Sequence, residues 1–141
     1  MVYDIINCSE NDVEYICDRL VEYNLRQVAK TQPIEFVNIN KKIMDDEYNI
    51  IAGCIARMYC WRVIYIDILW VDDKYRKQGL GTKLLKEIER VAEKEKCTLI
   101  HLDTFDFQAK DFYLRHGYEV FGVLEDCPEN HCRYYLKKKL K

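Results

Sequence analysis

Apolar residues recur along the chain with two periods, and these periods divide it into helices and strands. Helical spacing is present over residues 11–26, over 82–96 and, more briefly, over 108–116. In the second of these stretches one apolar stripe is formed by Leu84, Leu85, Ile88, Val91 and Ala92. Gly117 stands where a left-handed residue commonly ends a helix. The pattern therefore predicts three helices.

The remaining apolar residues follow the spacing of strands. We expect an edge strand over 1–7, and a loop with room to move over 29–34, where Pro33 argues against a continuing helix. Further strands are predicted over residues 36–44, 50–59, 63–71, 97–104, 118–124 and 132–137. The first three of these are joined by short turns and should form an antiparallel meander. Because a helix joins 63–71 to 97–104, a right-handed crossover should make these two strands parallel.

Composition adds limits to this α+β pattern. A chain of 141 residues with no linker or repeat is expected to form a single domain, residues 1–141. No run of eighteen apolar residues and no secretory signal is present, which predicts no membrane partner and a cytoplasmic protein. The seven cysteines are scattered without zinc-site spacing, so we expect reduced thiols and no metal.

Charge is unevenly distributed around a net value of −2. Residues 1–50 carry ten acidic and five basic side chains, whereas residues 74–96 carry eight basic and four acidic ones. This asymmetry suits a polyphosphate ligand at the basic segment and a cationic ligand near the acidic half, although an unevenly charged solvated surface explains the acidic half equally well. No basic face is interleaved with aromatic residues, so nucleic acid is not an expected partner.

The basic segment ends in two glycines that open a helix. The free N–H groups and the dipole at a helix N-terminus bind phosphate, and glycine lets an anion approach the backbone closely. A dinucleotide fingerprint needs a third glycine where Leu84 stands, and the lysine and spacing of a P-loop are absent. The turn from Gly79 to Thr82 therefore predicts a phosphorylated ligand of another kind.

Two motifs resemble those of the GCN5-related N-acetyltransferases (GNAT). Arg76-Lys77-Gln78-Gly79-Leu80-Gly81 is similar to the R-x-x-G-x-G/A loop of that family. Residues 109–118, with Ala109, Phe112, Tyr113, Gly117 and Tyr118, resemble its A-x-x-F-Y-x-x-x-G-[FY] helix. The resemblance implies a GNAT-like mixed, mostly antiparallel sheet of six to seven strands flanked by three to four helices. It also implies that the parallel pair splays apart after a bulge in its first strand.

The resemblance further implies acetyl-CoA as co-substrate and a set of residues that bind it. The backbone of the strand end would contact the pantetheine arm, and a backbone N–H near Leu69 would stabilise the oxyanion. The glycine turn would hold the pyrophosphate. The implied cofactor-binding residues are Leu69, Trp70, Val71, Arg76, Lys77, Gln78, Gly79, Leu80, Gly81, Thr82, Ala109 and Phe112.

Two residues are candidate catalysts. By resemblance, Tyr113 protonates the departing thiolate; its alternative role is to pack the helix face. Asp67 follows a family position that is often acidic and would accept the amine proton directly or through water; a carboxylate paired with a neighbouring Arg or Tyr is the alternative. Strand alternation predicts that Asp67 points to the same side as Leu69 and Val71, with Tyr65 lining the acceptor cleft. His131 and His101 are weaker candidates, and His101 is expected to be structural.

We therefore expect an N-acetyltransferase that moves an acetyl group to a primary amine in a ternary complex. The acidic N-terminal half favours a small cationic acceptor, while a protein or peptide amine is the alternative acceptor. An acyl-CoA-binding regulatory module is the alternative without catalysis. The N-terminal helix, the loop 29–34 and the closing hairpin would shape the acceptor site. Asp106, where the family often has Asn, departs from the pattern. A homodimer is compatible with the sequence, which does not fix the oligomeric state.

Overall fold

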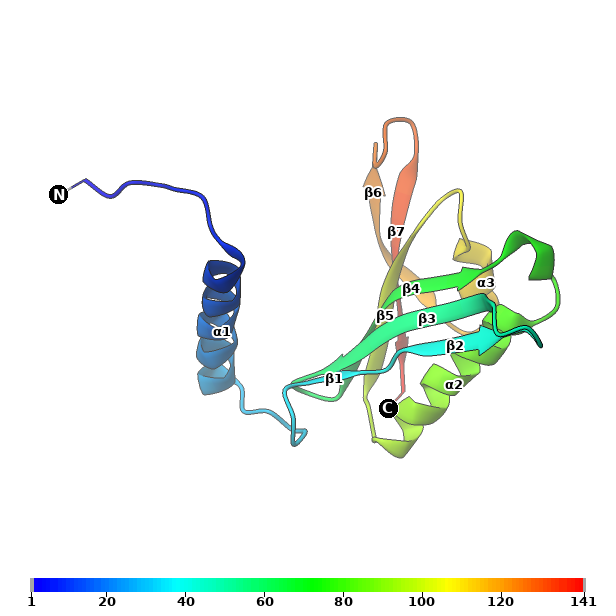
Figure 1. Ribbon diagram of the computed structural model, residues 1–141, viewed down its shortest axis with the longest axis horizontal. Helices are drawn as coiled ribbons and strands as arrows, with labels where there is room; N and C mark the ends of the chain where they lie inside the picture. Colours follow the sequence, from blue (N-terminus) through cyan, green and yellow to red (C-terminus); the bar gives the residue numbers. More distant parts are fainter. Residues whose placement is uncertain (1, 141) are drawn as a thin grey trace.

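A seven-stranded sheet organises the protein in a computed structural model that describes residues 2–140 (Figure 1). The strands are β1 (Phe36–Asn38), β2 (Lys41–Met44), β3 (Ile50–Tyr59), β4 (Val63–Val71), β5 (Leu99–Phe105), β6 (Glu119–Glu125) and β7 (Cys132–Lys139). The helices are α1 (Glu10–Gln27), α2 (Leu80–Lys94), α3 (Lys110–Arg115) and the 3₁₀ turn η1 (Asp73–Tyr75). No helix within residues 2–140 is long and apolar enough to cross a membrane.

The strand order is β1-β3-β4-β5-β7-β6, and β2 also pairs with β3. Every pairing is antiparallel except that of β4 with β5, which α2 connects by a crossover. The α+β fold class, with its mostly antiparallel sheet and its one parallel pair, is therefore confirmed.

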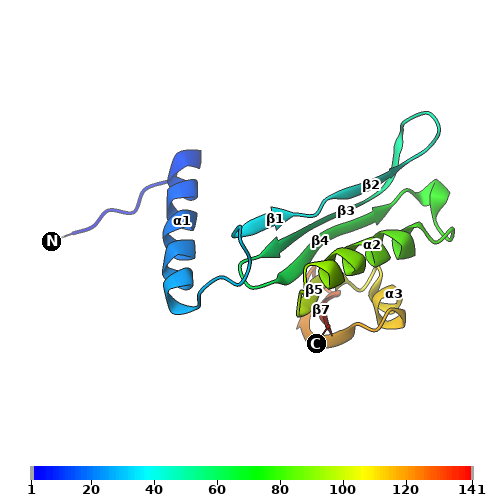
Figure 2. The same cartoon turned by 90° about the horizontal axis from the view of Figure 1, so that it is seen from below.

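One face of the sheet carries the core beneath α2 (Figure 2). The apolar stripe of α2 buries Leu84, Leu85, Ile88 and Ala92, as its helical spacing predicts. These side chains pack against alternate residues of the central strands, among them Ile64, Ile66, Ile100, Leu102 and Leu136. Burial of these side chains from both layers fixes α2 across the parallel pair, so its N-terminus is held at the end where the pair diverges.

Two predicted strands differ from the structure. Residues 2–7 are not in a strand, and Met1 lies outside the described residues. The predicted strand 36–44 is divided into β1 and β2 at Ile39 and Asn40. Ile39 is buried in the core, and the Asn40 side chain accepts a hydrogen bond from the Ala56 N–H at 3.2 Å. That side chain occupies a backbone donor of β3, so the alternating pattern alone overestimated the length of the strand.

The helix α1 extends away from the sheet at the far end from α2, and the N-terminal segment continues outward from it (Figures 1 and 2). Ser9 and Asp12 form a reciprocal capping box, which explains why the helix begins at Glu10. α1 buries none of its residues. We expected this helix to shape the acceptor site. Within a single chain, that expectation is therefore wrong.

The loop that follows α1 is held firmly, contrary to the expectation that it is free to move. The buried Gln32 donates to the Met58 carbonyl at 3.3 Å and accepts from the Arg62 N–H at 2.9 Å. Arg62 Nε donates to the Thr31 carbonyl at 2.9 Å. These bonds fix the base of α1 to the turn between β3 and β4.

Candidate active site

A bulge in β4 opens the sheet. The pairing of β3 with β4 passes from Ala56–Ile66 directly to Ile55–Ile68, which leaves Asp67 as the extra residue. The parallel pairing of β4 with β5 ends just before this bulge, at the pair Ile66 and Leu102. Beyond this point the two strands continue without pairing, so backbone groups of β4 face the space between them. A ligand can pair with these groups as an added strand would.

The space between the separated strands is a cleft of about 620 Å³. It is lined by β4 from Asp67 to Val71, by Asp103 and Thr104 of β5, by the turn from η1 to α2, and by α3 with its preceding loop. A cleft of this volume lies within the range of small-molecule and cofactor sites.

One end of the cleft is the N-terminus of α2. Gly79 adopts a left-handed conformation, with φ of 79°, and α2 begins at Leu80 without a side-chain cap. It thus begins two residues before the predicted start at Thr82, because a left-handed glycine sets the first turn. The leading N–H groups of the helix have no intrahelical partner and point at this end of the cleft. They are suited to an anion.

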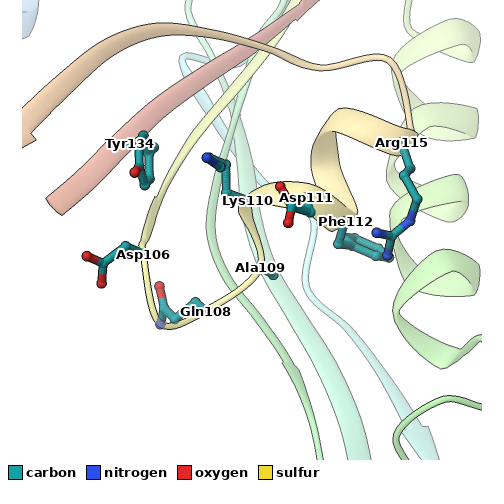
Figure 3. Close-up of a pocket in the computed structure, with 8 residues that line it drawn as sticks. All are labelled: Asp106, Gln108, Ala109, Lys110, Asp111, Phe112, Arg115 and Tyr134. Carbon is teal, nitrogen blue, oxygen red and sulfur yellow. The ribbon is translucent and has the colours of Figure 1, made fainter. Parts of the chain in front are cut away.

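Cationic side chains surround that end. Arg76 and Lys77, which the motif predicted, line the cleft, and Arg76 also pairs with Asp73 at 3.0 Å. Arg115, in the last turn of α3, lines the cleft as well, and Figure 3 shows its side chain beside Phe112. Sequence reasoning missed Arg115. It could have been predicted from its position three residues after Phe112, because this spacing places both side chains on one face of the helix.

Gly81 has a packing role as well as a backbone role. A Cβ built at Gly81 would lie 3.5 Å from the Phe112 ring and 3.8 Å from Val71 Cγ2. These are ordinary van der Waals distances, so alanine fits whereas a larger side chain would displace Phe112. The first turn of α2 and the face of α3 are thus in close approach at the cleft.

The loop before α3 is fixed by hydrogen bonds and borders a second hollow of about 370 Å³ (Figure 3). Gln108 Oε1 accepts from the Phe105 N–H at 2.7 Å and from the Thr104 hydroxyl at 3.1 Å. The hollow shares Gln108, Ala109, Phe112 and Arg115 with the cleft. Asp106 lies on its outer side and accepts from the Cys132 N–H at 2.9 Å. Asp106 therefore fastens this loop to β7.

Tyr113 lies on the buried side of α3, behind the residues that line the cleft. Its ring packs edge-on against Phe112 and Tyr118, with centroids 5.1 and 5.8 Å away. Burial raises the pKa of the Tyr113 hydroxyl well above the usual tyrosine value, with smaller effects from Cys54 and Asp103. The hydroxyl therefore stays protonated across the physiological range.

Asp67 is an exposed carboxylate that lines the cleft at the bulge of β4. Asp67 is the bulged residue, so strand alternation is interrupted between Tyr65 and Asp67, whereas Asp67, Leu69 and Val71 all line the cleft. Leu69 and Val71 pack toward the core. Within residues 2–140 Asp67 forms no hydrogen bond or ion pair, so the pairing alternative is not observed.

A second carboxylate near the cleft was missed. Asp103 of β5 accepts a hydrogen bond from the Tyr65 hydroxyl at 2.8 Å and pairs with Arg133 of β7. Burial and the Asp103 bond raise the pKa of Tyr65 to about 12. Asp103 could have been predicted in the same way as Asp67, because both are carboxylates within an apolar strand. Tyr65 turns toward Asp103 and does not line the cleft.

The two candidate histidines have structural partners. His101 Nε2 lies 2.7 Å from the Tyr59 hydroxyl, and its ring packs between Tyr59 and Tyr65. Burial lowers the pKa of His101. His131 Nδ1 lies 2.9 Å from Asp106 Oδ1, outside the cleft. Neither ring lines the cleft.

Most of the predicted site residues therefore meet in one place. Twelve of them line the cleft: Asp67, Leu69, Trp70, Val71, Arg76, Lys77, Gly79, Leu80, Gly81, Thr82, Ala109 and Phe112. Gln78 is exposed and does not line it, and it follows Lys77, whose φ is 65°. Tyr113 lies behind it. The lining combines an anion-binding end with a carboxylate at the strand bulge.

Comparison with known proteins gives consistent matches. The family model described as acetyltransferase (GNAT) domain matches residues 40–120. A blasticidin-S acetyltransferase of Streptomyces morookaense is 35% identical over 91 residues, which cover 64% of this chain and 67% of that protein.

Two solved structures resemble the whole chain. The crystal structure of an acetyltransferase from Bacillus cereus is 37% identical, covers 98% of both chains and gives a TM-score of 0.88. A second crystal structure, from Agrobacterium tumefaciens, is 26% identical, covers 99% of this chain and all of the other, and gives a TM-score of 0.84.

Proposed function

Because the chain belongs to the GNAT acetyltransferase family and is an N-acetyltransferase, we propose that it transfers an acetyl group from acetyl-CoA to a small, cationic primary amine in a ternary complex. The observation that carries this proposal is the cleft between β4 and β5, which joins an anion-binding helix N-terminus to a free carboxylate. The name of the Streptomyces relative supports a small-molecule acceptor.

The residues of the cleft fit the parts of acetyl-CoA. Free N–H groups from Gly79 to Thr82, together with Lys77 and Arg115, would hold the pyrophosphate. The unpaired edge of β4 from Leu69 to Val71 would bind the pantetheine amides. When bound, the thioester supplies an acetyl group activated for attack by an amine.

The proton transfers fall to two side chains. Asp67, exposed and without a partner in the described residues, accepts a proton from the acceptor ammonium directly or through water. A backbone N–H near Leu69 stabilises the charge that develops on the carbonyl oxygen. Tyr113 holds its proton up to high pH and supplies it to the departing thiolate.

The proposal is tested by thiol release from acetyl-CoA in the presence of polyamines, amino acids, aminoglycosides and peptides. We expect amine-dependent release, highest with a small polycationic acceptor. Preference for a peptide would replace the small-molecule acceptor by a protein amine. Tight binding of CoA in calorimetry, with no amine raising the rate, would contradict the enzymatic proposal.

A further inference from the structure

The part of the chain before the sheet has an apolar surface with no partner in its own molecule. We name residues 2–27 the N-terminal arm. Along α1 an apolar stripe at helical spacing is formed by Val13, Ile16, Leu20 and Tyr23. Each of these four residues is 51–60% exposed. Before α1, Val2, Tyr3, Ile5 and Ile6 are at least 82% exposed. An amphipathic helix is stabilised mainly by burial of such a stripe.

The sheet has a matching uncovered surface on the side opposite α2. We name this the open face. Its strand register brings together Phe36 of β1 with Tyr59 of β3, and Ile55 of β3 with Ile68 of β4. Phe36, Ile55, Ile68 and Trp70 are each 41–50% exposed there. Large apolar side chains exposed together on one face of a sheet are typical of an interaction site in soluble proteins.

The arm cannot cover the open face of its own chain while its base is held. α1 ends at Gln27, and the next residue, Val28, accepts a hydrogen bond from Trp61 Nε1 at 3.0 Å. The bonds of Gln32 and Arg62 fix the following residues. Two packed antiparallel elements need a connection of several free residues, and none remains between α1 and its anchor. The helix, about 27 Å long at 1.5 Å per residue, therefore projects outward.

We propose that the arm packs on the open face of a second copy of this chain, and that the second copy returns its own arm in a reciprocal exchange. Such an exchange satisfies both surfaces with a single two-fold interface. The charges are complementary, since the arm carries six acidic and two basic residues. The open face presents Arg57 over Tyr65 and Lys137 over Phe121.

The solved relatives support a defined position for the arm. The arm makes up 26 of the 141 residues, so an alignment that left it out could give a TM-score of at most about 0.82. The observed scores of 0.88 and 0.84 are higher, which supports a similar position of the arm in both solved structures. The hydrogen bonds at its base set the direction of the arm, and its exposed apolar stripe still lacks a surface that covers it within the described residues.

The exchange also bears on the cleft. Ile68 and Trp70 belong both to the open face and to the lining of the cleft. A partner arm on this face would therefore border the acceptor end of the site. The helix expected to shape the acceptor site would then come from the second copy.

Sedimentation equilibrium of the full chain gives the first test. We expect about 34 kDa, twice the 17.0 kDa of one chain. Ile16→Asp with Leu20→Asp should give a folded 17.0 kDa monomer, because α1 buries nothing within its own chain. Glu14→Gln with Asp18→Asn, on the opposite side of the helix, should keep the dimer and weaken it only slightly, since these carboxylates face away from the apolar stripe. A wild-type monomer at all concentrations would overturn the proposal.

Cross-linking separates exchange from other dimers. The exposed or half-buried thiols, Cys8, Cys17, Cys127 and Cys132, are first replaced by serine. One chain with Leu20→Cys and Ile55→Cys is then treated with a bifunctional maleimide. Exchange predicts covalent dimers, and a differently tagged pair, one chain with each cysteine, should cross-link to each other after refolding together. Asp18→Cys in place of Leu20→Cys should lower the yield strongly. Cross-links confined to the monomer would show an arm folded on its own chain and would contradict the exchange.

Discussion

The two faces of the sheet differ in how their surfaces are completed. The face beneath α2 is finished by the same chain, with a closed core and a glycine turn that sets the cleft. The open face carries hydrogen-bonded polar side chains, His101 and Asp103 among them, beside exposed apolar ones. A ligand held from the first face meets a preformed site, whereas under the proposed exchange the acceptor would meet a surface that a second chain completes. Substitutions on the two faces should therefore have different effects.

The largest effect is expected at Tyr113, on the closed face. Tyr113→Phe should lower kcat by roughly 10²–10⁴, because general acid catalysis contributes this much. Its hydroxyl forms no hydrogen bond within the described residues, so thermal stability should change little. The measurement is steady-state thiol release with saturating amine.

Tyr118→Phe is the matched control on the same face. The Tyr118 hydroxyl donates to Glu89 Oε2 at 2.9 Å, away from the cleft. Its loss should cost about 1 kcal/mol of stability and leave kcat unchanged. If both phenylalanine variants keep full activity, Tyr113 is a packing residue and the acid role is wrong.

A smaller loss is expected at Asp67, where the cleft opens to solvent. Asp67→Asn should lower kcat/KM for the amine about tenfold near neutral pH, since an exposed base can be replaced by water in part. The loss should shrink at high pH, where the acceptor amine loses its proton without help. A pH profile of both enzymes measures this. A loss that is equal at every pH would indicate positioning of the acceptor instead of proton transfer.

At the anion-binding end, Arg115→Gln should weaken CoA binding about fivefold, or ~1 kcal/mol, because the cation is exposed and screened. Arg90→Gln is the control, since Arg90 lies on the outer side of α2 and pairs with Glu87. Calorimetry with CoA measures both. Equal affinities would remove Arg115 from the phosphate site.

The smallest effect concerns His101 on the open face. Burial lowers its pKa, so the folded protein holds His101 neutral while the unfolded chain binds a proton as the pH falls through about 6.5. The free energy of unfolding should therefore decrease from pH 7.5 to pH 5.5. Urea denaturation at these two values should show a smaller decrease for His101→Gln. An identical decrease in both proteins would assign the pH dependence elsewhere.

Sequence reasoning predicted most of what local chemistry determines. The stripe of α2, the glycine turn and the helix containing Tyr113 depend on residues close in the chain, and the structure contains each of them. The antiparallel meander and the parallel pair followed from the chain connectivity, whereas the position of β7 between β5 and β6 was not predicted.

The features that were not predicted from the sequence depend on contacts between residues that are distant along the chain. The bulge at Asp67 was implied only by the family resemblance, because its position is defined by the register of β4 against β3. The role of Asp103 depends on its partners Tyr65 and Arg133, which lie on two other strands. The position of α1 is set by Trp61 and Arg62, far along the chain, and its amphipathic pattern says only that some surface must cover it.

Mass spectrometry after a single turnover shows whether an amine attacks acetyl-CoA directly, as proposed for the β4–β5 cleft. The enzyme is mixed with acetyl-CoA, first alone and then with the most active amine from the panel. We expect an unmodified enzyme in both mixtures and an amine heavier by one acetyl group only in the second. An acetylated enzyme that passes its group to the amine, or CoA binding with no acetylated amine, would contradict it.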